Sequence, residues 1–139
     1  MASMSVATHG GFAGRRPYLL AVAGAGLLAW VGLWVHNAAD LPRQTPLSPE
    51  SVGPGLVSLL LIALWFLPRS RRLAGWLLLA WASLNLVGGA ILSVLPLPIL
   101  PFAPEQSLRH YLFHVLYGVC QLPLIAAVLV ALRRTRPHD

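Results

Sequence analysis

The sequence predicts an all-α integral membrane protein, a four-helix bundle with a short cytoplasmic turn and two irregular outer loops. Hydrophobic residues make up 57% of its 139 positions and charged residues only 10%, a balance that soluble domains rarely reach. The mean hydropathy is +0.71. A spanning helix needs about 20 apolar residues. Four such segments fit into a single membrane domain over residues 1–139.

Each of the four apolar segments has features of a spanning helix. The first contains no charged residue and carries Trp30 and Trp34 near its end, where aromatic rings suit the membrane interface. We expect it to remain as an anchor, because no good small-residue cleavage site follows it. The second contains Pro54, which a helix tolerates in its first turns. The spans are expected at residues 18–35, 51–68, 73–95 and 110–132.

The arginines predict the orientation. All ten basic residues are arginine, which favours a GC-rich bacterial source. Basic residues in short flanking segments stay on the cytoplasmic side, so we expect an inner (plasma) membrane protein with segments 1–16 and 133–139 in the cytoplasm. The net charge of +6 fits contact with anionic lipid and gives no reason to expect nucleic acid binding. The arginines on the predicted cytoplasmic side are Arg15, Arg16, Arg69, Arg71, Arg72, Arg133, Arg134 and Arg136.

The last predicted span has one polar face. Positions i, i+4, i+7 and i+11 share a face of an α-helix. Lipid disfavours such a face, so it should turn toward other helices or toward a water-filled cavity. The stripe consists of Ser107, His110, His114, Tyr117 and Gln121.

Two other spans carry groups that match this face. In the first span, a stripe of small residues that includes Ala29 and Gly32 ends in His36 at the outer rim. The third span contributes Asn85 near mid-membrane and Ser93 near its outer end. The sequence therefore predicts a polar pocket that opens outward between three helices.

One interpretation of this pocket is structural. Asn85 and Gln121 would form an amide pair between helices, and Tyr117 would donate to a backbone carbonyl that Pro123 leaves free. The sequence has no phosphate loop, nucleophile elbow, HExxH motif or carboxylate pair, and its lone Cys120 excludes an internal disulfide. This interpretation favours a non-enzymatic subunit or accessory protein without a cofactor, joined to a membrane-protein partner or in a homo-oligomer.

A second interpretation assigns the histidines to a metal site. His110 and His114 lie at i and i+4 and can bind one ion, with His36 as a third ligand. Asp40 or Glu105 would supply an oxygen ligand or orient a ring. Copper and zinc suit imidazole, whereas a haem would take one axial histidine from each of two helices. A third interpretation is a channel or transporter component built as an oligomer.

Overall fold

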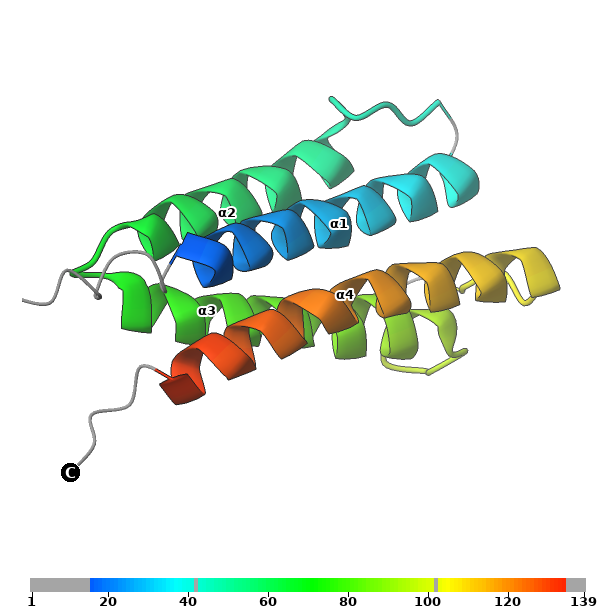
Figure 1. Cartoon of the computed structure of the whole chain (residues 1–139). Coiled ribbons are helices and arrows are strands. Elements are labelled where there is room, and N and C mark those ends of the chain that lie inside the picture. Colours follow the sequence, from blue (N-terminus) through cyan, green and yellow to red (C-terminus); the bar gives the residue numbers. More distant parts are fainter. Residues whose placement is uncertain (1–15, 42, 102, 135–139) are drawn as a thin grey trace, which may run out of the picture.

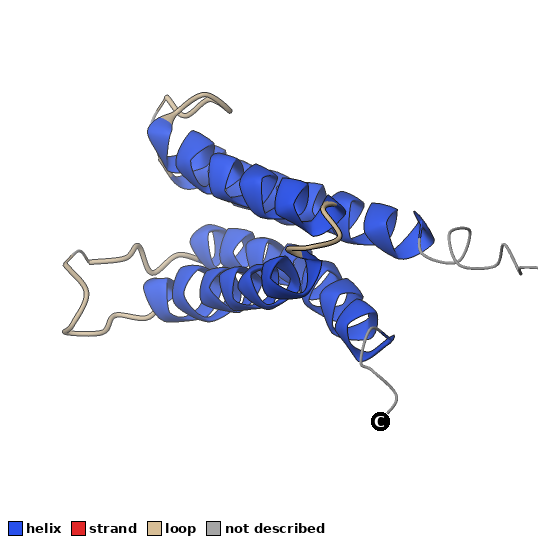
Figure 2. Cartoon of the chain, turned by 90° about the vertical axis from the view of Figure 1, so that its left-hand side faces the viewer, coloured by secondary structure: helices blue, strands red, loops and turns tan. Residues whose placement is uncertain are grey.

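The computed structural model describes residues 16–41, 43–101 and 103–134 and confirms the all-α four-helix bundle. Figure 1 shows α1 beside α2 and α3 beside α4, and Figure 2 shows the two pairs stacked as layers. Each helix, with α3 taken through its extension, is long and apolar enough to cross a membrane, so the chain is a small membrane protein. The helices are α1 (Arg16–Asp40), α2 (Pro49–Phe66), α3 (Arg71–Leu84), its extension η1 (Asn85–Ile91) and η2 (Leu92–Val94), and α4 (Leu108–Arg134).

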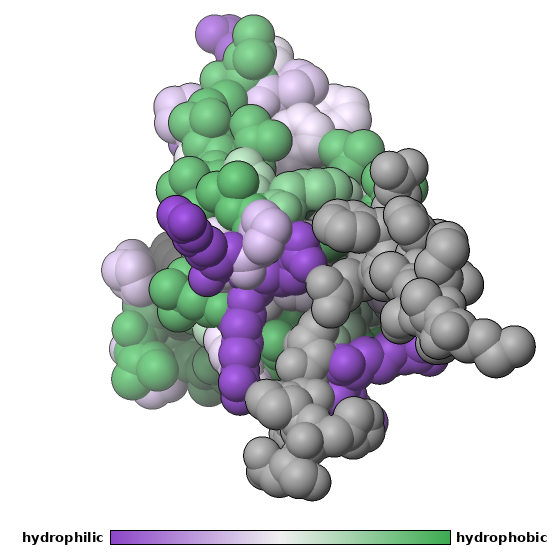
Figure 3. All heavy atoms as spheres, turned by 60° about the vertical axis from the view of Figure 1, so that its left-hand side comes forward, coloured by the Kyte–Doolittle hydropathy of each residue, from purple (hydrophilic) through white to green (hydrophobic). Residues whose placement is uncertain are grey.

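The two ends of the bundle differ in chemistry. We call the end at which α1 and α3 begin the arginine end; in the described residues it carries Arg69, Arg71, Arg72, Arg133 and Arg134. We call the opposite end the histidine end; among the described residues it carries His36, His110, the carboxylates Asp40, Glu50 and Glu105, and the arginines Arg43 and Arg109. Figure 3, which brings the arginine end forward, shows strongly hydrophilic side chains gathered between hydrophobic ones.

The turn between α2 and α3 is closed by side chains that bond the last carbonyls of α2. The Ser70 hydroxyl donates to the Leu64 carbonyl at 2.8 Å. The Arg71 guanidinium donates to the carbonyls of Trp65 at 3.1 Å and Phe66 at 3.2 Å. These bonds satisfy acceptors that have no partner inside the helix, so α2 can end abruptly at a tight turn.

α3 does not remain a regular helix as far as residue 95. From Asn85 to Ile91 it widens into a π-helix, and it ends in a 3₁₀ turn over Leu92–Val94. The widened segment contains Gly89, where a Cβ atom would lie 2.9 Å from the Tyr117 hydroxyl. The missing side chain therefore lets the backbone approach the Tyr117 ring.

α1 and α4 make the most extensive helix pairing of the bundle. Gly32 is central to it, because a Cβ there would lie 2.5 Å from Cys120 Cβ and 2.9 Å from its Sγ. Small residues allow such a close approach, and His36, one turn beyond Gly32, therefore reaches α4. The buried core around this pairing includes Val22, Ala29, Leu78, Leu124 and Val128.

We predict that Gly32→Ala destabilises the bundle whereas Gly24→Ala does not. The new methyl at position 32 forces α1 away from Cys120, and overpacking of this kind costs about 1–3 kcal/mol. A Cβ at Gly24 would have no atom within 4 Å, and alanine favours a helix over glycine by about 1 kcal/mol. Unfolding in mixed detergent, followed by circular dichroism, compares the two variants. Equal stability would contradict the close approach.

Candidate functional site

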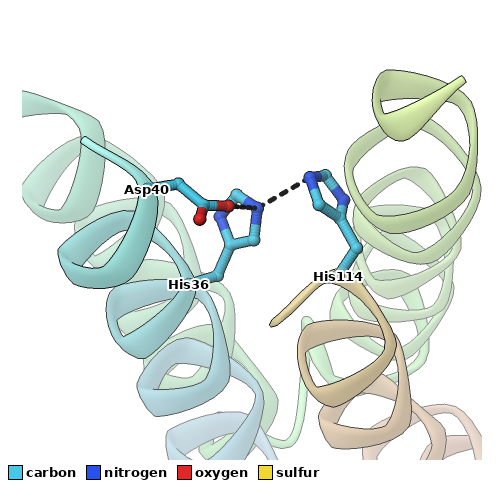
Figure 4. Close-up of side chains that lie close together, drawn as sticks. All are labelled: His36, Asp40 and His114. Carbon is cyan, nitrogen blue, oxygen red and sulfur yellow. Dashed lines mark hydrogen bonds and ion pairs between the residues drawn. The ribbon is translucent and has the colours of Figure 1, made fainter. Parts of the chain in front are cut away.

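Four of the predicted site residues meet at the histidine end between α1 and α4; we call them the His/Asp cluster. His36 and Asp40 lie one turn apart on α1, and His110 and His114 one turn apart on α4. His36 Nε2 lies 2.9 Å from His114 Nε2 and 3.2 Å from Asp40 Oδ2 (Figure 4). His110 Nδ1 lies 2.8 Å from the same Asp40 oxygen. Ligand atoms of His36, Asp40 and His114 all lie within 4.8 Å of one another.

The ring of His114 is oriented by the end of α3. Its Nδ1 lies 3.2 Å from the Ala90 carbonyl, which can only accept, so Nδ1 carries the hydrogen. A neutral imidazole has a single N–H, and Nε2 therefore directs a lone pair toward His36. In a continued π-helix the Leu95 N–H would donate to the Ala90 carbonyl. In the 3₁₀ turn it donates to the Leu92 carbonyl instead, at 3.2 Å.

The ring of His36 is oriented by α2 through Asn37. The Asn37 side-chain amide donates to the Glu50 carbonyl and to the Ser51 hydroxyl, both at 3.2 Å. Pro54 lacks the N–H that would otherwise bond Glu50 within α2, so this carbonyl is free to accept. Because the Asn37 amide nitrogen donates to the Glu50 carbonyl, the amide oxygen points the other way. This oxygen lies 3.3 Å from His36 Nδ1. His36 therefore donates from Nδ1, and its Nε2 also presents a lone pair.

Two acceptors consequently face each other across 2.9 Å at the centre of the site. Each ring has used its N–H on a carbonyl oxygen, so neither Nε2 has a hydrogen to give to the other. Two lone pairs at this distance repel unless a proton or a metal cation lies between them. The arrangement is therefore suited to binding a cation.

The cluster is largely shielded from solvent. His114 is 4% exposed and His110 9%. The approach of His110 to Asp40 has the distance of an ion pair but not the direction of a hydrogen bond. Among the described residues, neither ring nitrogen of His110 has a hydrogen-bond partner. Buried polar groups in native proteins are nearly always satisfied by protein, water or an ion, so His110 has the capacity for a further partner.

Three other predicted residues lie outside the cluster. Glu105 is exposed in the segment before α4. The Ser107 hydroxyl accepts the backbone N–H of His110 at 3.2 Å and so caps the start of α4. Ser93 donates to the Gly89 carbonyl. The two serines therefore bond the backbones of their own segments.

Deeper in the bundle, the polar stripe is used in structural bonds. Tyr117 donates to Asn85 Oδ1 at 2.5 Å, and the Asn85 amide donates to the Trp81 carbonyl at 2.8 Å. Gln121 donates to a backbone carbonyl of α1 at 3.2 Å. The expected Asn85–Gln121 amide pair is therefore wrong, as is the expected bond from Tyr117 to a carbonyl freed by Pro123. Asn85 bonds Tyr117 instead, and Gln121 bonds α1.

The residues that sequence reasoning missed are those that orient the histidines. Asn37 is 6% exposed and Ser51 fully buried. One signal in the sequence could have identified Asn37, which directly follows His36 in a polar run. If the first helix had been predicted to extend to Asp40, Asn37 would have been placed beside α2. Arg109 was also missed; it donates to the Ala39 carbonyl at 2.6 Å and ties the start of α4 to the end of α1.

Fold and site together define a small four-helix membrane protein with a buried His/Asp cluster at one end. No family model matches the chain, and the searches of curated proteins and of solved structures gave no significant match. Its function therefore has to be argued from the cluster itself.

We predict that Asn37→Ala destabilises the protein far more than Gln44→Ala. The first change removes the partner of the His36 Nδ1–H and two bonds to α2, and buried groups left unpaired cost about 1–3 kcal/mol. The second removes an exposed contact to Glu50, the kind that contributes about 0–1 kcal/mol. Thermal unfolding in detergent measures both, and a similar loss in the two variants would show that Asn37 does not hold α1 to α2.

Proposed function

We propose that this membrane protein binds a divalent transition-metal ion, Zn²⁺ or Cu²⁺, at the His/Asp cluster. The observation that carries the proposal is the pair of Nε2 atoms of His36 and His114, which face each other at 2.9 Å. In both rings the Nδ1 side is held by a carbonyl oxygen. Metal-bound histidines have this outer contact almost always, since it fixes the tautomer and the ring orientation.

The distances support a compact ligand set. Around a tetrahedral ion with bonds of about 2.0–2.1 Å, ligand atoms lie about 3.3 Å apart. The 3.2 Å between His36 Nε2 and Asp40 Oδ2 matches this spacing. The two imidazoles would have to separate by about 0.4 Å, which a small rotation of either ring provides. His110, beside Asp40 and without a hydrogen bond, is the fourth ligand in this proposal.

The chemistry of the donors supports zinc or copper. Three neutral imidazoles and one carboxylate form a nitrogen-rich set with one negative charge, whereas Mg²⁺ and Ca²⁺ prefer oxygen ligands. The ring centroids of His36 and His114 are 4.2 Å apart in an edge contact. The His36 and His110 centroids are 6.3 Å apart, and Asp40 Oδ2 lies between these two rings. Neither pair leaves room for a porphyrin plane, so the geometry favours an ion over a haem.

The proposal keeps the non-enzymatic role expected from the sequence. The positive-inside rule assigns the arginine end to the cytoplasm, so the ion would enter from the outer face. The deeper polar groups Tyr117, Asn85 and Gln121 are bonded within the bundle, which favours an ion held at the rim over an ion passed through. A partner subunit or a second copy would then receive the ion or be stabilised by it.

We predict that the chelator-treated protein in mild detergent binds one Zn²⁺ or Cu²⁺ per chain in a calorimetric titration. His36→Ala and His114→Ala should each weaken binding by more than about 100-fold, because loss of a ligand exceeds the 10–100-fold effect of losing an outer contact. Bound metal should also raise the unfolding temperature of the unaltered protein, since ligand that binds only the folded state stabilises it.

Matched controls exist for both ligand types. His138→Ala removes a histidine in the C-terminal segment, outside the described residues, and Glu105→Gln removes an exposed carboxylate in the segment before α4. Both controls should bind metal like the unaltered protein, while Asp40→Asn should bind it more weakly. If the folded double variant of His36 and His114 retained full affinity, the ion would bind elsewhere and the proposal would fail.

A further inference from the structure

A cavity lies at the arginine end of the bundle, between α3 and α4. Its volume is about 150 Å³. One arginine from each helix lines it together with apolar side chains, so it combines positive charge with a hydrophobic wall. The lining residues are Arg72, Trp76, Leu129, Leu132 and Arg133.

The arginines at this end have different environments. Arg71 donates to two carbonyls at the end of α2. Arg134 donates to the Tyr18 hydroxyl and lies over the Tyr18 ring, 4.7 Å from its centroid. Arg72 and Arg133 have no hydrogen-bond or ion-pair partner within the described ranges 16–41, 43–101 and 103–134. The cavity is therefore lined by two guanidinium groups that make no bond within the described part of the bundle.

The electric field near the cavity favours an anion. The carboxylates of the described residues belong to Asp40, Glu50 and Glu105, at the histidine end. α3 begins at this end with its positive dipole terminus and α4 ends there with its negative one, so the two helix dipoles oppose each other and the arginine side chains supply the charge. The Ser70 hydroxyl donates to α2 and does not cap the first amides of α3. No carboxylate in the described part of this end pairs with Arg72 or Arg133.

We propose that this cavity binds the phosphate headgroup of an anionic phospholipid. Arg72 and Arg133 would hold the phosphate oxygens, because guanidinium forms paired hydrogen bonds with phosphate. Trp76, which is 49% exposed, and Leu129 would contact the glycerol and the first acyl carbons. The apolar wall favours a lipid over free phosphate, and basic pockets between spanning helices suit such headgroups. This site is independent of the metal proposal.

Native mass spectrometry of the full chain in mild detergent tests the proposal. Phosphatidylglycerol, phosphatidylcholine with the same acyl chains, and sodium phosphate are titrated separately. We expect phosphatidylglycerol to bind in preference to phosphatidylcholine. Arg72→Gln and Arg133→Gln should each weaken phosphatidylglycerol binding by about 5–30-fold. Arg72→Lys should retain part of the affinity, because lysine keeps the charge but not the forked donor.

Arg69→Gln is the matched control, because Arg69 is exposed in the adjacent turn and does not line the cavity. It removes the same charge and should leave binding unchanged. The proposal is overturned if Arg69→Gln weakens binding as much as Arg72→Gln, since general charge would then explain the affinity. Equal binding of the two lipids would overturn it as well. Displacement of phosphatidylglycerol by sodium phosphate at equal concentration would show that the cavity takes free phosphate instead.

Discussion

One chain of polar contacts crosses all four helices at the histidine end, and the arrangement of the site depends on it. The chain runs from Ser51 on α2 through Asn37 and His36 on α1 to His114 on α4, and ends on the Ala90 carbonyl in the extension of α3. In a membrane, unsatisfied polar groups are costly, so each link constrains the next. The chain is satisfied everywhere except at its centre, where two acceptors meet. In our proposal, a cation bound between them completes the chain.

Two local irregularities of the backbone make this chain available. Pro54 removes an N–H from α2 and frees the Glu50 carbonyl, which fixes Asn37 and through it His36. The change from α-helix to π-helix and then to a 3₁₀ turn in α3 leaves the Ala90 carbonyl for His114. Both features break the regular register of a helix, and π segments of this kind are frequent at functional sites. A carbonyl that a regular helix would have used thus positions His114 directly and His36 through Asn37.

The sequence was sufficient for the helices and for the residues of the cluster, but not for the contacts that orient them. Hydropathy and the 3.6-residue period were enough to predict four helices, the polar face of α4 and its pairing with α1. The same period failed in α3, because it assumes a regular helix and the π register rotates every later side chain. Asn85 lies at the start of this segment, before the rotation, and its side chain bonds Trp81 and Tyr117 instead of Gln121. The role of Asn37 depends on the free Glu50 carbonyl in another helix, which no pattern along one helix encodes. The position of Glu105 depends on an irregular segment, which helix periodicity does not describe.

X-ray absorption at the zinc edge of the metal-loaded protein tests the central claim most directly, because it reports the ligands around the ion itself. The account predicts about four nitrogen and oxygen ligands at about 2.0–2.1 Å, with the outer-shell scattering of coordinated imidazole rings. In the His36→Ala, His114→Ala double variant this imidazole signal should fall. A shell of oxygen atoms without imidazole scattering would contradict the account, because the facing Nε2 atoms of His36 and His114 would then not be metal ligands.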